Sequence, residues 1–207
     1  MQLTVTLGSM VALFAAMLVL AAMPSSSVLI VVSRSANSGF IHGALAALGI
    51  VVGDIFFILI AILGLSLLAE SMAEMFVLVR YLGGAYLVWM GISLLRAKPA
   101  ELKVKNSGSA SLSSSFISGL LFTLADQKAI LFYLGFLPAF INLSSLTLAD
   151  IAVILAITLI AVGGVKVAYA FMAGGVASLF SDRAKTALNI ASGSLMLAIG
   201  LFVVVNA

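Results

Sequence analysis

Long apolar runs alternate with short polar ones along the chain, and this pattern predicts six helices that cross a membrane. The apolar runs cover approximately residues 3–23, 40–68, 76–95, 116–141, 148–171 and 187–205. Each run is long enough to span a bilayer as a helix, which takes roughly 20 apolar residues. Composition agrees, because 8% of the residues are charged whereas soluble domains average about 25%. We therefore predict an all-α integral membrane protein embedded in a lipid bilayer.

The first predicted helix contains a break at Pro24, Ser25 and Ser26. The apolar run that follows, residues 28–32, is too short to span a bilayer by itself. We expect helix 1 to be kinked at Pro24 and to continue through this run, with the serine hydroxyls bonding backbone groups that the kink releases. The alternative is that Pro24 ends the helix at the membrane surface.

The fourth predicted helix is interrupted near its middle by Asp126, Gln127 and Lys128. In a regular helix, Asp126 and Lys128 would point to nearly opposite faces. An aspartate directly before a helix can accept hydrogen bonds from the first backbone N–H groups. We therefore expect a half-helix that begins at Gln127 with Asp126 as its cap.

The chain divides into two similar halves, residues 1–95 and 116–207, joined by a polar linker at 96–115. Each half opens with an interrupted helix. Each then has a glycine-marked helix with a buried charge, Gly53 beside Asp54 in one half and Gly163 before Lys166 in the other. Three helices per half force opposite orientations, so the pattern predicts two three-helix inverted repeats in one transporter domain.

Positive charges are distributed unevenly among the predicted loops. Seven of the eight Lys and Arg residues outside the predicted membrane core lie in the loops after helices 1, 3 and 5. The opposite side has Arg80 alone. The residues in these loops are Arg34, Arg96, Lys98, Lys103, Lys105, Arg183 and Lys185. Because cytoplasmic loops are enriched in Lys and Arg, we predict that these loops are cytoplasmic and that both termini lie outside.

Four charged residues fall inside predicted spans: Asp54, Asp126, Lys128 and Lys166. Asp54 lies about 20 Å from either end of its apolar run, and it shares a helical face with the small residues Gly43, Ala47 and Ala61. A charge at bilayer depth costs on the order of 3 kcal/mol on insertion scales, so we expect these side chains to pair inside the protein. Lys128 and Lys166 are the candidate partners of Asp54.

The four charges support two interpretations. They can form a substrate and proton pathway beside the broken helices, as buried ionisable groups do in transporters. The alternative is that they are static ion pairs that hold the two halves together in a non-transporting scaffold or assembly protein. Asp54 is the best candidate for a proton-coupling group or an amine ligand.

Other function classes have little support in the sequence. The chain has no cysteine and one histidine, so no metal site or cofactor is expected. No phosphate loop or nucleophile motif is present, which argues against an enzyme. The basic residues do not form one patch, so no nucleic-acid partner is expected. Small-residue faces on helices 3 and 6 permit a homodimer.

Several spaced motifs resemble the lysine exporter (LysE/homoserine-threonine exporter) family. In the first half the similar positions are 24–35, Gly39, Gly43, Gly49, Gly53, Asp54, 83–87 and Gly91; in the second they are Phe116, Gly119, 126–132 and 137–140. The resemblance implies a six-helix, multi-pass exporter of amino acids or similar small solutes in the bacterial inner membrane, driven by the proton gradient as an antiporter.

The chain departs from this family at both breaks. The family usually has Pro-Gly-Pro where this chain has Pro24-Ser25-Ser26, and Asn-Pro-Lys where it has Asp126-Gln127-Lys128. Each departure removes a proline at a helix break and adds polar groups. Substrate and coupling can therefore differ from the family pattern, and the carry-over is firmest for Asp54, Lys128 and the glycines.

Overall fold

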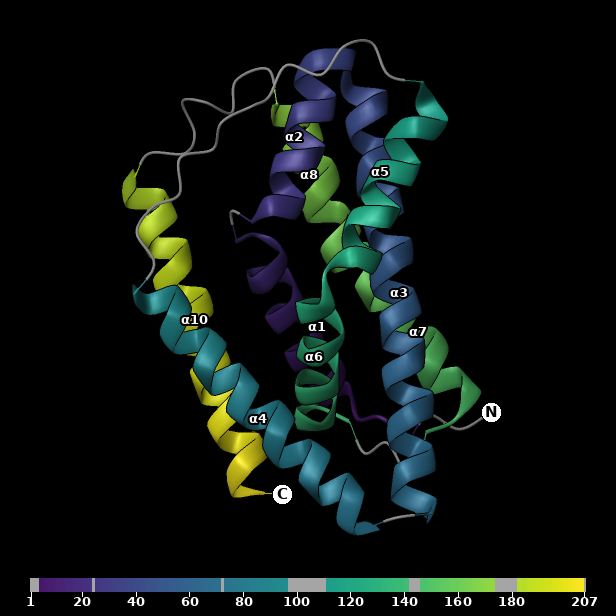
Figure 1. Cartoon of the computed structure of the whole chain (residues 1–207), viewed down its shortest axis with the longest axis vertical. Helices are drawn as coiled ribbons and strands as arrows, with labels where there is room; N and C mark the ends of the chain where they lie inside the picture. Colours follow the sequence, from purple (N-terminus) through teal and green to yellow (C-terminus); the bar gives the residue numbers. More distant parts are fainter. Residues whose placement is uncertain are drawn as a thin grey trace.

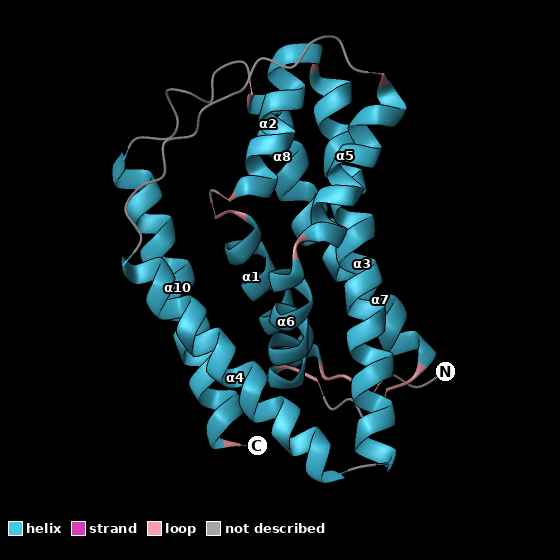
Figure 2. Cartoon of the chain, viewed as in Figure 1, coloured by secondary structure: helices cyan, strands magenta, loops and turns pink. Residues whose placement is uncertain are grey.

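The protein is a bundle of helices in a computed structural model that describes residues 4–23, 25–71, 73–96, 111–141, 146–173 and 182–206. Every regular element in these ranges is helical (Figures 1 and 2), which confirms the predicted all-α class. Four helices are long and apolar enough to span a membrane, and two bent pairs bring the total to six when each pair counts as one span. Most of the predicted linker, residues 97–110, lies outside the described residues.

The first span is broken as predicted. Helix α1 (Leu7–Ala21) and helix α2 (Ser26–Ser38) meet at 64°. Pro24 itself lies outside the described residues, but Ser25 occupies the position before α2 and has extended backbone angles. The apolar run after the break is thus a continuation of the bundle rather than an exposed surface strip, since Val28 and Val31 are fully buried.

The next two spans are single helices, α3 (Phe40–Ser71) and α4 (Ala73–Arg96), close to the predicted bounds. Gly39 joins α2 to α3 with a φ of 96°, a backbone angle that favours glycine because it has no Cβ. The N–H of Gly39 donates to the Ser35 carbonyl at 2.9 Å, which closes the end of α2. Helix α3 therefore starts in a fixed direction beside α2.

The fourth span is also broken where the sequence predicts. Helix α5 (Leu112–Ala125) and helix α6 (Gln127–Phe136) are separated by Asp126, and the span bends by 65° there. A short 3₁₀ turn, η1 (Leu137–Ala139), follows α6 and contains Pro138. The half-helix α6 is therefore short and has an irregular segment at each end.

The fifth span contains a feature that the sequence pattern does not reveal. Helix α7 (Leu148–Thr158) and helix α8 (Gly164–Met172) are joined by a π-helical turn, η3 (Leu159–Gly163). Such turns widen a helix by one residue and occur often at functional sites. The last span is one helix, α10 (Asp182–Val205).

Glycines allow the closest helix contacts. Helix α4 packs most extensively on α10, where Gly84 meets Gly200 and Gly91 meets Gly193 so closely that an added Cβ would lie 2.8–3.1 Å from a backbone oxygen. These glycines belong to the small-residue faces predicted on helices 3 and 6. Their small-residue faces meet within one chain, so they do not supply a dimer surface, and the homodimer stays an untested prediction.

Both chain ends lie at the same end of the bundle, the lower end in Figure 1. This is the arrangement that an even number of spans requires. Which end faces the cytoplasm, and whether the two halves are inverted repeats, remain predictions from the charges and the break positions.

Candidate functional site

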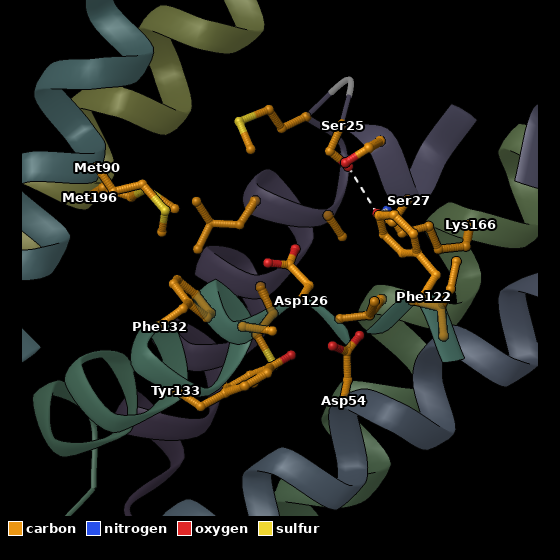
Figure 3. A pocket seen from close by; sticks show the side chains of 18 residues that line it. Ser25, Ser27, Asp54, Met90, Phe122, Asp126, Phe132, Tyr133, Lys166 and Met196 are labelled. Carbon is orange, nitrogen blue, oxygen red and sulfur yellow. Dashed lines mark hydrogen bonds between the residues drawn. The ribbon is translucent and has the colours of Figure 1, made fainter. Parts of the chain in front are cut away.

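A cavity of about 250 Å³ lies in the middle of the bundle, where the two broken spans meet (Figure 3). Its lining includes Ser25, Ser26 and Ser27 from the first break and Asp126 from the second. Asp54 and Lys166 also line it. The structure therefore brings three of the four charged residues singled out in the sequence into one cavity with both breaks.

Asp54 reaches the cavity from the middle of α3. Its predicted face is buried against neighbouring helices, since Gly43, Ala47 and Ala61 are all buried. Asp54 itself is 9% exposed. The hydroxyl of Tyr133, from α6, donates a hydrogen bond to its carboxylate, and Figure 3 shows the two side chains pointing toward one another. A buried carboxylate thus has a specific donor on the opposite half of the chain.

Lys166 approaches from the other side of the cavity, on the first turn of α8. It is 3% exposed, and its ammonium donates a 2.8 Å hydrogen bond to the Ser27 hydroxyl. The hydroxyls of Ser27 and Ser25 are in turn 2.9 Å apart. The Lys166 charge lies close enough to act on Asp54. Of the two candidate partners of Asp54, Lys166 is therefore in place.

The other candidate, Lys128, and its neighbour Gln127 have backbones in the first turn of α6, but their side chains lie outside the described part of the structure. Asp126 directly precedes them. Its carbonyl accepts a 2.9 Å hydrogen bond from the Ala129 N–H, and its carboxylate points into the cavity (Figure 3). The half-helix begins at Gln127 as predicted, and a capping role of the Asp126 side chain stays a prediction.

Two glycines that the sequence associates with the site lie beside it rather than in its lining. Gly53 packs against Thr123 of α5, 2.7 Å from where its Cβ would be, so it lets α3 and α5 approach one residue before Asp54. Gly163 ends the π turn and is buried. Gly53 therefore helps to position Asp54, whereas Gly163 ends the π turn three residues before Lys166.

Sequence reasoning missed the residues that make up the rest of the lining. Tyr133 is one of them, and its signal was a single tyrosine in the apolar run that follows Lys128. The others form an apolar wall that includes Met17, Met90, Phe132 and Met196. Figure 3 shows Met90 and Met196 across the cavity from Lys166 and Ser27. Lys166 and Ser27 thus lie away from Met90 and Met196, and Phe122 lies with the charged groups beside Lys166 and Asp54.

Comparison with known proteins identifies the family. The sequence model of the LysE type translocators matches residues 5–207. The chain belongs to this family. As a LysE type translocator with long apolar helices, it is a multi-pass membrane transport protein, and the resemblance inferred from its motifs is confirmed.

Several proteins are similar to this translocator over most of their length. An uncharacterized membrane protein of Synechocystis sp. is 49% identical over 99% of this chain and 100% of its own. The leucine efflux protein of Enterobacter sp. is 29% identical over 82% of this chain and 81% of its own. The leucine efflux protein of Klebsiella pneumoniae is 29% identical over 78% of this chain and 77% of its own. No solved structure matches the translocator.

Proposed function

We propose that this protein is a secondary transporter, not an enzyme, and that it exports amino acids or similar small zwitterions from the cell in exchange for protons. The observation that carries the proposal is that opposite charges from the two halves line one cavity between two broken helices. Family membership and the leucine efflux relatives support the direction and the substrate class.

The polar side of the cavity suits the two charges of an amino acid. Helix α2 begins beside Lys166, with Ser25 before its first turn. A helix N-terminus carries a partial positive charge, and such half-helix ends bind substrate carboxylates in transporters of this general plan. We place the substrate carboxylate at this helix end, beside Ser27 and Lys166. The substrate ammonium then lies between Asp54 and Asp126.

The apolar side of the cavity suits an uncharged side chain of moderate size. Met90, Phe132 and Met196 lie away from Lys166 and Ser27, and methionine adapts to irregular shapes because its side chain is flexible and polarizable. A volume of about 250 Å³ is below the roughly 300–1,000 Å³ of drug-sized sites. A leucine-like amino acid therefore fits the proposal better than a larger solute.

Proton coupling follows from the balance of charges. Among the described lining residues there are two carboxylates, Asp54 and Asp126, and one ammonium, Lys166. A proton and a substrate ammonium compete for the oxygens of the Asp54 carboxylate, so loading one displaces the other. Competition of this kind is what an antiporter needs.

Flux in proteoliposomes tests the proposal. Vesicles loaded with radiolabelled leucine should release it faster when a pH gradient is imposed, and Asp54→Asn should abolish this acceleration. Glu74→Gln, which removes an exposed acid at the start of α4, is the matched control and should behave as wild type. Leucine flux that does not depend on the pH gradient would contradict proton coupling. Normal coupling in the Asp54→Asn variant would contradict the role of Asp54 in it. The absence of any amino-acid flux would instead favour the scaffold interpretation.

A further inference from the structure

A second cavity of about 410 Å³ lies nearer the end of the bundle at which both termini are found. Three elements line it: the start of α1, the segment after α6, and the last third of α10. The lining includes Gly8, Ser9, Ala12, Phe140, Ala198 and Ile199. Nothing in the family match or in the names of the relatives assigns a role to this cavity.

The same three elements also line the central cavity. On α1, Met17 faces the central cavity and Ala12 the second one. On α10, Met196 lines the central cavity and Ile199 lines the second one. On α6 and the turn after it, Phe132 lines the central cavity and Phe140 lines the second one. Eight residues separate them, which is about 12 Å at the rise of a helix. The two cavities therefore follow one another along a common seam of the bundle.

One buried aromatic side chain contacts a lining residue of each cavity. Phe136 is fully buried, and its ring is stacked on Phe132 with centroids 4.7 Å apart. On its other side it contacts Phe140, with centroids 4.8 Å apart. Phe132 lines the central cavity and Phe140 lines the second. Leu13 of α1 is 1% exposed and belongs to the same buried cluster.

We propose that the second cavity is a vestibule on the side of the chain termini and that Phe136 is the gate between it and the central cavity. This inference rests on the proposed transport function and adds an exit path to it. A solute that leaves the central cavity passes Phe136 when this side chain turns away from Phe132. If the termini lie outside, as the charge pattern predicts, this is the direction of export.

The placement of Phe136 on α6 links the gate to the charged site. The same short helix carries Tyr133, whose hydroxyl bonds to Asp54. It has a break at Asp126 before it and a 3₁₀ turn with Pro138 after it, so it can shift as a unit. A change in the charge or contacts of Asp54 therefore acts on α6, the helix that carries Phe136.

Thiol labelling tests the gate without relying on transport, because the chain has no cysteine of its own. Ala198→Cys reports on the vestibule and Ala129→Cys on the central cavity. A charged, membrane-impermeant methanethiosulfonate is added to sealed vesicles on the side of the termini, which an epitope tag identifies. We expect Ala198→Cys to react quickly whether or not Phe136 is replaced. Ala129→Cys should react at least tenfold faster when combined with Phe136→Ala than in the otherwise wild-type chain.

Phe56→Ala is the matched control, since Phe56 is 50% exposed on α3 and should leave both rates unchanged. If Phe136→Ala does not yield folded protein, Phe136→Leu replaces it in the test. The labelling rate of Ala129→Cys should still rise in the Phe136→Leu background. An unchanged rate in the folded Phe136 variant overturns the gate. Reaction of Ala198→Cys with a lipophilic maleimide but not with the charged reagent shows a cavity that opens to lipid, and overturns the vestibule.

The same vesicles separate this inference from the proposed function. If Phe136→Ala accelerates labelling in vesicles that transport no amino acid, the result supports the gate and contradicts the proposed amino-acid export. Coupled leucine flux with labelling that ignores Phe136 would keep the export function and reject the gate.

Discussion

Lys166 of α8 donates a 2.8 Å hydrogen bond to Ser27 of α2, which joins the second half of the chain to the first break. The residues are 139 positions apart, and both lie in the wall of the central cavity. Since the Lys166 charge also acts on Asp54, one side chain links a helix break to the buried acid. Its removal should thus affect stability and transport in ways that can be separated.

Replacing Lys166 with Met should destabilise the folded protein and abolish leucine efflux. Removing one partner of a buried charge pair costs roughly 3–5 kcal/mol, because the other charge is left uncompensated. Adding Asp54→Asn removes that leftover charge, so the double variant should regain most of the thermal stability in detergent while efflux stays absent. Arg96→Met, at the exposed end of α4, is the control and should change neither quantity. Efflux restored in the double variant would show that the charges are only structural.

Replacing Tyr133 with Phe should lower efflux while leaving the fold intact. The ring stays in place, but the hydroxyl that donates to Asp54 is lost. Hydrogen bonds to charged groups contribute roughly 1.5–3 kcal/mol, so we expect about a tenfold loss of leucine efflux or more. Thermal stability and monodispersity should change little. The matched control is Tyr81→Phe, because Tyr81 is exposed at 45%; an equal effect in both variants would remove the special role of Tyr133.

The charged side of the site was predictable from the sequence because a charge inside an apolar run is costly and therefore conspicuous. Asp54, Asp126 and Lys166 all line the cavity, and both breaks lie where Pro24 and Asp126 predict them. Helix bounds were predictable for the same reason, since the polar loops contrast sharply with the spans. The closeness of the Lys166 charge to Asp54 was not predictable, because helix order alone does not place one helix against another.

The apolar side of the site could not be predicted, because it has no contrast with its surroundings. Phe136 and Met196 look like any other apolar residue in a span, and lipid-facing and buried positions are equally hydrophobic in a membrane helix. The π turn at Leu159–Gly163 is also invisible in a uniformly apolar run. These features depend on contacts between distant helices, and only the three-dimensional arrangement reveals them.

Replacing Gly49 with Ala should destabilise the bundle. A Cβ at this position of α3 would lie 2.1 Å from the Phe116 carbonyl oxygen, and this backbone atom cannot move without separating α3 from α5. Overpacking of this kind costs roughly 1–3 kcal/mol. Gly64→Ala, on the same helix with nothing within 4 Å of the added Cβ, is the control. It should be neutral or stabilising by up to about 1 kcal/mol, because Ala favours the helix. Thermal denaturation in detergent measures both, and equal stability of the two variants would contradict this account.

Asp150 ties the start of the chain to the start of α7, and its loss should release the N-terminal segment. Its carboxylate accepts from the backbone N–H groups of Thr4 and Val5 at 3.0 and 3.1 Å and from the Thr4 hydroxyl at 2.7 Å. It also accepts from the N–H and hydroxyl of Thr147 at 2.9 and 2.7 Å, which caps α7. The side chain is fully buried, so these donors take the place of water.

An Asp150→Asn variant keeps the shape of the side chain but turns one acceptor oxygen into a donor nitrogen. That nitrogen cannot accept from the Thr4 and Thr147 hydroxyls as the carboxylate does, so the segment before α1 should detach more often. We expect hydrogen exchange at the Thr4 and Val5 amides to rise at least tenfold. Ser111→Ala removes a similar cap, at α5, where the Ser111 hydroxyl accepts from the Ser114 N–H, and should leave these two amides unchanged. Because Gly8 and Ser9 line the second cavity, the freed segment should also alter labelling of Ala198→Cys. Unchanged exchange at Thr4 and Val5 would show that other contacts hold the N-terminus.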